Sequence, residues 1–267
     1  MAATHTHTLL VQSACRNVAT YPSPGAYVLS LPFFYRNVRR AKLVSAEIPR
    51  SFYVFRASAG NTSVTVTVGG VAKAVTIPDG NYDPATMAAA LQAALVAAFP
   101  APAFAASVSA TSNRLTISTT STSFSLLASV TRSADPVHWG LAKHLGFASA
   151  GATYASTANA LTGDIPMDPD YVKYLVLDIT EFNTVDDLFT SGNKSAFVKL
   201  QLSRAAAFAP IVYKESDICS YSRADLVPSI GKLDRLTVRW RYPDGTPVDF
   251  NGAEHSFALV LEEVENA

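Results

Sequence analysis

The sequence predicts an all-β protein, a single jelly-roll sandwich with a small α+β module of ββαββ order inserted in one of its loops. Short alternating segments, typical of half-buried strands, occur near both ends of the chain and number roughly eight or nine. The middle of the chain has a different composition, rich in Ala, Ser and Thr. At 267 residues, the chain is long enough to bury a sizeable core.

The N-terminal part of the jelly roll, residues 1–57, contains short apolar segments separated by prolines. Strands are expected at residues 9–11, 26–31, 42–48 and 52–55. Prolines stand at positions 22, 24, 32 and 49. Because proline has no N–H to donate to a strand ladder, we expect these residues at strand ends and in turns.

The inserted module is expected at residues 58–168. Between residues 57 and 131 the only charged side chains are Lys73, Asp79, Asp83 and Arg114. Residues 63–77 alternate on both sides of Gly69-Gly70, which predicts a hairpin with a tight turn. A second hairpin is expected at residues 106–118, and a short helical piece at residues 135–147.

One amphipathic helix is expected between the two hairpins. Asp83 suits the N-cap and Pro84 the first turn, and Pro100 and Pro102 end the helix. An apolar stripe recurs every four residues, at Met87, Leu91, Leu95 and Phe99. We expect this stripe to be buried on one small sheet formed by the hairpins.

The C-terminal part of the jelly roll, residues 169–267, returns to the strand pattern at residues 174–179, 196–202, 211–213, 235–241 and 257–261. In the segment from 235 to 241, one side consists of Leu236, Val238 and Trp240. The other side consists of Arg235, Thr237, Arg239 and Arg241. The alternation predicts that the arginines line the outer face of a half-buried strand.

Composition and charge exclude several classes of protein. The chain has 21 basic and 21 acidic residues, which argues against a protein that mainly binds nucleic acid. With 16% charged and 49% hydrophobic residues, part of the surface is expected to be covered by other subunits. The N-terminal residues do not have the pattern of a secretory leader, and no apolar stretch reaches the roughly 20 residues that span a bilayer. We therefore expect the protein to be made and used in the reducing interior of a cell.

No catalytic or metal-binding pattern is present. Cys15 and Cys219 lack the spacing of a zinc site and are expected to be buried or idle thiols, and the five histidines form no ligand set. A triad of Cys219 or a serine with His255 and Asp249 has no nucleophile elbow to support it. We therefore expect no enzyme activity, no cofactor, no metal and no small-molecule substrate.

Two basic clusters are the candidate functional residues. They are Arg36, Arg39 and Arg40, near Lys42 and Arg50, and then Arg235, Arg239 and Arg241. Two interpretations stay open: a solvated strand face paired locally with Glu47, Asp234 or Asp249, or a subunit interface of salt bridges. Nucleic-acid contact is disfavoured because no aromatic stacking platform is interleaved with the arginines.

Both ends of the chain resemble minor capsid or penton-type proteins of large icosahedral DNA viruses, the nucleocytoplasmic large DNA virus group. The resemblance lies in "YPSPGAYVLSLPFFYRNVRRAKLVSAEIPRSFYVF", "SGNKSAFVKLQL" and "IGKLDRLTVRWRYPDGTPVDFNGAEHSFALVLE". The positions that match the family pattern are Glu47, Pro49, Leu233, Asp234, Arg235, Asp244, Gly245, Phe250 and His255. The segments cover roughly half the chain, and the Ala-rich middle matches only in outline.

The resemblance implies a structural virion protein without enzyme activity, located in the capsid and assembled in the host cytoplasm. The expected function is that of a penton protein, which closes the five-fold vertices of the shell. Its expected partners are copies of itself, in a pentamer, and other capsid proteins. The first alternative is a minor capsid protein that cements major capsomers. A second is a receptor- or carbohydrate-binding module, which rests on analogy between sandwich folds.

Overall fold

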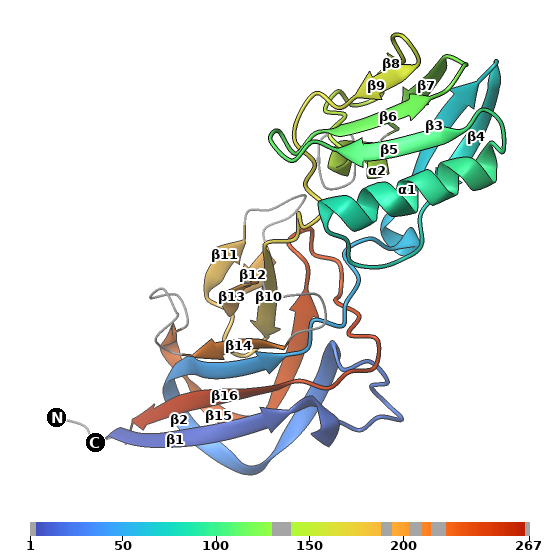
Figure 1. The fold of residues 1–267 in the computed structure, drawn as a ribbon. Helices are drawn as coiled ribbons and strands as arrows, with labels where there is room; N and C mark the ends of the chain where they lie inside the picture. The colour runs from blue at the N-terminus through green and yellow to red at the C-terminus, as the bar shows by residue number, and fades with distance from the viewer. Residues whose placement is uncertain (1–3, 130–139, 188–193, 203–209, 215–222, 265–267) are drawn as a thin grey trace. The chain divides into compact units, whose positions relative to one another are not determined.

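The computed structural model describes residues 4–129, 140–187, 194–202, 210–214 and 223–264 (Figure 1). By its internal contacts the chain divides into two compact units. Unit 1 contains Met1–Phe52 and Val172–Ala267, and unit 2 contains Tyr53–Tyr171. Unit 2 is therefore inserted in the sequence of unit 1.

The described residues of unit 1 form antiparallel strands and one short 3-10 helix. Seven of its strands form one sheet in the order β1-β16-β2-β15-β10-β13, with β14 also paired to β2, and β11 and β12 form a separate ribbon. The elements are β1 Thr4–Gln12, η1 Ser13–Cys15, β2 Ala26–Ile48, β10 Tyr174–Ile179, β11 Val185–Asp187, β12 Lys194–Ala196, β13 Val198–Gln201, β14 Ile211–Lys214, β15 Arg223–Arg241 and β16 Ser256–Val264.

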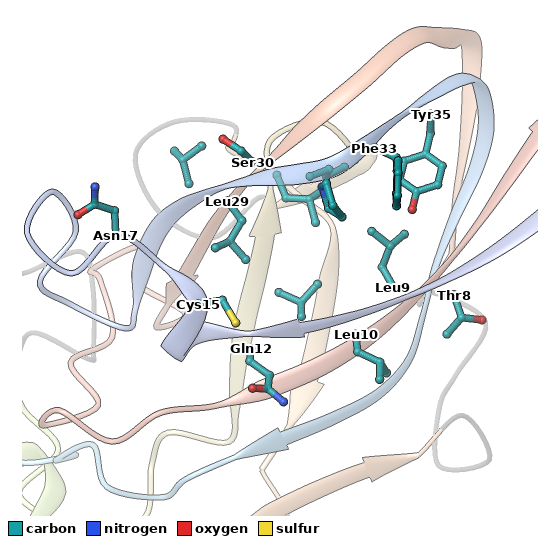
Figure 2. A pocket seen from close by; sticks show the side chains of 15 residues that line it. Thr8, Leu9, Leu10, Gln12, Cys15, Asn17, Leu29, Ser30, Phe33 and Tyr35 are labelled. Carbon is teal, nitrogen blue, oxygen red and sulfur yellow. The ribbon is translucent and has the colours of Figure 1, made fainter.

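The large sheet curls because β2 and β15 each take part in two stretches of pairing. Residues 26–42 of β2 pair with β15 and residues 45–48 pair with β14 along one edge, whereas residues 38–47 pair with β16 along the other edge. The curl brings β1 close to residues 28–35 of β2, although the two strands are not paired (Figures 1 and 2). The all-β, jelly-roll-like prediction is confirmed.

The strand boundaries expected around Pro32 are wrong, because β2 runs without a break for 23 residues. Its register with β15 shifts between the pairs Ser30↔Arg235 and Tyr35↔Leu233, so Pro32 lies in a bulge where no ladder hydrogen bond is needed. Strand β15 bulges in the same way between Asp225 and Ile230, and this segment contains Pro228. Each long strand thus carries its proline in a bulge.

The core of unit 1 lies between the curled parts of the sheet. Leu236, Val238 and Trp240 are all buried, which confirms the inward face predicted for this strand. They pack in the same core as Tyr27 of β2 and Phe257 of β16, both 2% exposed. Burial of such large side chains is the main stabilising contribution to a fold of this kind.

The strand expected at residues 52–55 is also wrong. Phe52 packs edge-on against Phe250, with ring centroids 6.2 Å apart, inside unit 1. Phe55 packs against Tyr82, at 5.7 Å, inside unit 2 and forms only an isolated bridge to Gly80. The apolar segment therefore supplies side chains to two cores and does not form one strand.

The described residues of unit 2 form one long helix and two antiparallel sheets. The sheets have the strand orders β4-β3-β7-β8 and β5-β6-β9. The two predicted hairpins therefore lie in different sheets, not in one small sheet. The elements are η2 Ala57–Ala59, β3 Ser63–Val68, β4 Val71–Thr76, α1 Pro84–Ala98, β5 Phe104–Val108, β6 Leu115–Thr119, β7 Phe124–Leu127, α2 Leu141–His144, β8 Thr153–Ala155 and β9 Ala160–Thr162.

The local elements of unit 2 follow their sequence signals closely. The tight turn joins β3 to β4 with positive φ at both Gly69 and Gly70, as a primed turn requires. The carboxylate of Asp83 accepts a hydrogen bond from the Thr86 N–H, 2.7 Å away, at the start of α1. The predicted stripe at Met87, Leu91, Leu95 and Phe99 is buried. Of the helical piece predicted at 135–147, residues 141–144 form α2, and residues 135–139 lie outside the described residues.

Candidate assembly surface

The six arginines predicted to be functional lie on the two long strands of unit 1, β2 and β15. Arg36, Arg39 and Arg40 are on β2, and Arg235, Arg239 and Arg241 are on β15. These two strands are direct neighbours in the sheet. The structure thus brings the two sequence clusters onto adjacent strands, but the six side chains have different environments.

Arg36 belongs to a small cation–aromatic cluster. Its guanidinium carbon lies 4.9 Å from the centroid of the Phe34 ring, and the Lys232 ammonium lies 5.7 Å from the same centroid. Lys232 is directly opposite Arg36 in the ladder and forms an ion pair of 2.9 Å with Asp234. This ion pair lowers the pKa of the Asp234 carboxyl. Phe34 is 50% exposed, so the cluster presents to solvent an aromatic ring with two cations close to it.

Arg235 and Arg239 lie on the outer face of β15, as predicted. Both side chains are exposed and make no hydrogen bond or ion pair with another residue in the part of the chain that the structure describes. Between them, Thr237 is bound by Glu181, whose carboxylate accepts from the Thr237 N–H and hydroxyl at 2.9 Å each. Glu181 is thus engaged within the fold. Arg39 is exposed as well and, within the described ranges, has no polar partner.

Arg40 forms pairs inside the sheet. Its Nε donates to Asp225 on β15 at 2.6 Å, and its Nη1 donates to Glu262 on β16 at 2.7 Å. Both carboxylates belong to residues directly opposite Arg40 in the ladders. These hydrogen bonds raise the pKa of Arg40 and lower that of Asp225. The interpretation that the arginines pair locally is therefore correct for Arg40, but its partners are Asp225 and Glu262 and not the expected Glu47, Asp234 or Asp249.

Arg241 is the clearest departure from the alternation pattern. It is 1% exposed, although it follows Arg235 and Arg239 on the same side of the strand. Its Nε donates to the carboxylate of Asp178 on the neighbouring strand β10, at 2.8 Å. The expectation that Arg241 lines the outer face is wrong, because the chain after β15 turns at Gly245 and pairs back onto Arg241 through Pro247.

An uncharged groove opens between β1 and β2 (Figure 2). It has a volume of about 600 Å³, and its two walls are residues 8–12 of β1 and residues 28–33 of β2. The edge contact between the His7 and Tyr35 rings, 5.0 Å apart, links the two strands near one end. Leu10 and Phe33, at the groove, are 80% and 75% exposed. Exposed side chains of this size are typical of surfaces that other molecules cover.

A polar cluster that the sequence did not indicate, with Ser13, Arg16 and His255 buried and Glu254 exposed, holds the connection between β1 and β2. Arg16 is 7% exposed and binds Glu254, with 2.6 Å between Nη1 and Oε2. The Ser13 hydroxyl also donates to Glu254, and it accepts from the N–H of His255 at 2.8 Å. Because these partners are more than 230 residues apart, no local pattern signals the cluster.

The structure offers no support for the chemistry considered from the sequence. His255 is buried, and its Nε2 donates to the carbonyl of Pro24 at 2.9 Å, while Cys219 lies outside the described residues. Cys15 is exposed. Within the described ranges, no three His, Cys, Asp or Glu side chains are grouped as metal ligands would be, and no helix is long and apolar enough to cross a membrane.

Comparisons with known proteins identify a similar fold. No protein-family model and no curated protein sequence matches the chain. Among solved structures, the crystal structure of the selenomethionine-labelled mavirus penton protein is similar, with a TM-score of 0.56 and 10% sequence identity. The match covers 98% of this chain and 100% of the penton protein chain. At this identity the likeness concerns the fold, and this chain therefore has a viral penton-like fold.

Proposed function

We propose that the chain is a structural capsid protein that closes the five-fold vertices of an icosahedral shell by assembling with copies of itself. The observation that carries the proposal is the end-to-end likeness in fold to a penton protein, which covers 98% of this chain and all of the other. A likeness of this extent includes the inserted unit as well as the sandwich. The resemblance of the two chain ends to penton-type proteins supports the same function.

Several surface properties support association of copies. The net charge is zero, so no long-range repulsion opposes contact between identical chains. Phe33 and Phe34 are exposed next to Arg36, and aromatic and arginine side chains are enriched in protein interfaces. The uncharged groove beside Leu10 adds further apolar surface.

Four of the six predicted arginines are proposed as interface residues: Arg36, Arg39, Arg235 and Arg239. They are exposed, so carboxylates of a neighbouring copy can reach them. Arg40 and Arg241 are assigned to pairs within the fold. Charged pairs at the edge of an interface set orientation and specificity more than affinity.

The finer parts of the proposal concern the viral context. We infer a virion location with assembly in the host cytoplasm, other capsid proteins as further partners, and a relationship to the large DNA virus group. The segment 58–168 is proposed to act as a separate module that contacts neighbours or faces outward. No catalytic step is part of this function.

Copy number in purified particles tests the vertex assignment. Isotope-labelled peptides of this chain and of the major shell protein give the ratio of the two by mass spectrometry. We expect five copies for each vertex, because closed five-fold rings fix the number. A number that follows the capsomers would support the cementing role instead, and absence from particles would reject both.

A further inference from the structure

The thirteen residues between β1 and β2 are held in place by residues from the far end of the chain. Arg16 donates from Nη1 to both Glu254 oxygens, at 2.8 and 2.6 Å, and also to the Ser13 carbonyl at 2.9 Å. Its other guanidinium nitrogens donate to the carbonyls of Tyr21 and Pro22, at 2.9 and 3.1 Å. We call Ser13, Arg16, Glu254 and His255 the loop anchor.

His255 completes the anchor from inside the core. Its backbone is bound to Ser13 in both directions, since the Ser13 N–H donates to the His255 carbonyl at 2.9 Å and the His255 N–H donates to the Ser13 hydroxyl. Its ring Nε2 lies 2.9 Å from the Pro24 carbonyl, so this nitrogen carries the proton in the neutral ring. His255 therefore contacts both ends of the β1–β2 connection.

The rest of the His255 ring lies among aromatic side chains. The ring centroids of Trp240, Phe250, Tyr27 and Phe257 are 5.2, 5.3, 5.8 and 6.1 Å away. Nδ1 is buried and has no hydrogen-bond partner among the described residues. Protonation places a positive charge and a new N–H at this nitrogen, in surroundings that do not solvate a cation.

We propose that the loop anchor is an acid-sensitive device that releases the β1–β2 connection as the pH falls. Protonation of His255 and of Glu254 act in the same direction, because the first places a charge in the aromatic surroundings and the second removes the partner of Arg16. The released connection includes Cys15 and Asn17, which line the uncharged groove between β1 and β2. Acid would thereby alter the proposed assembly surface although the residues that line the groove stay uncharged.

The charged and titratable groups around His255 support this direction. Burial is the main cause that lowers the pKa of His255 from 6.5 to about 4; the charge of Arg16 acts in the same direction, whereas the hydrogen bond to Pro24 and the charge of Glu254 oppose the shift. The hydrogen bonds from Arg16 and Ser13 hold the pKa of Glu254 below its usual value. Tyr27 stays neutral, because burial raises the pKa of its hydroxyl. Strands β15 and β16 contribute Trp240 and Phe257, which do not ionise.

The direction in which pH shifts the equilibrium between the anchored and released states follows from proton linkage. The released state binds a proton on His255 with a pKa near 6.5 and the anchored state with a pKa of about 4, so acid favours release. From His255 alone, the equilibrium constant for release rises about 30-fold between pH 7.5 and pH 5. Glu254 adds to this below its ordinary pKa of 4.5.

Hydrogen exchange of the full chain, followed by mass spectrometry, tests the proposal between pH 7.5 and 4. After correction for the intrinsic pH dependence of exchange, protection of residues 13–25 is expected to fall about 30-fold by pH 5, while β10 keeps its protection. In His255→Gln this dependence is expected to disappear down to pH 5. His5→Gln, at an exposed position on β1, is the matched control and is expected to behave like the parent chain.

Fluorescence of Trp240 gives a second test, which does not require the His255→Gln variant to fold. In Trp139→Phe, Trp240 is the only indole, and its ring contacts His255. Since a protonated imidazole quenches indole fluorescence more than a neutral one, emission is expected to fall over the same pH range as loop protection. Constant protection of residues 13–25 down to pH 4, or a loss with the same midpoint in His255→Gln, would overturn the proposal.

Discussion

Replacing Arg241 by alanine is expected to lower the free energy of unfolding of unit 1 by about 3–5 kcal/mol. The guanidinium is 1% exposed and its Nε lies 2.8 Å from the Asp178 carboxylate. Removing one partner of a buried ion pair takes away a charge that offsets the cost of burying the other, and this is strongly destabilising. Urea unfolding followed by Trp240 fluorescence, in the Trp139→Phe background, measures the change.

Arg239→Ala is the matched control for this substitution. Arg239 lies two residues earlier on the same side of β15 but is exposed and unpaired within the described part of the chain. Its loss is expected to change the free energy of unfolding by less than about 0.5 kcal/mol. Equal effects of the two substitutions would show that burial of Arg241 has been misassigned.

Charge reversal on the outer face of β15 is expected to abolish self-association without unfolding the chain. In Arg235→Glu with Arg239→Glu, two exposed cations become anions, and like charges across an interface repel. We expect the mass in solution to fall to the 28.4 kDa of a single chain, with the melting temperature nearly unchanged. Light scattering and calorimetry on the same sample separate the two effects.

Arg114→Glu provides the control for charge reversal, because Arg114 is an exposed arginine of unit 2, whereas the proposed interface arginines belong to unit 1. This variant is expected to keep the parent mass. An assembled double variant with a lowered melting temperature would assign the β15 arginines to folding and remove them from the interface proposal.

Local signals in the sequence predicted the local structure of unit 2 well. The turn at Gly69-Gly70 and the helix capped by Asp83 depend on residues a few positions apart, and both are present. The way the hairpins combine was not predictable in the same manner. Strand β7 lies between β3 and β8 in one sheet, and its four residues, Phe124–Leu127, are too few for a clear alternation.

Errors in unit 1 come from long-range structure. Pro32 argued for a strand end, but a bulge formed with the partner strand accommodates it. Alternation assigned Arg241 to the correct side of β15, yet it carries no information on which later segment covers that side. The loop anchor joins Arg16 to Glu254 across the whole sequence, and only the fold brings these residues together.

Assembly of the chain with copies of itself is tested most directly by its mass in solution at several salt concentrations. A closed ring predicts a mass five times the 28.4 kDa of one chain at low salt, with dissociation as salt screens the pairs between charged strands. A monomer at every salt and protein concentration would contradict this assembly.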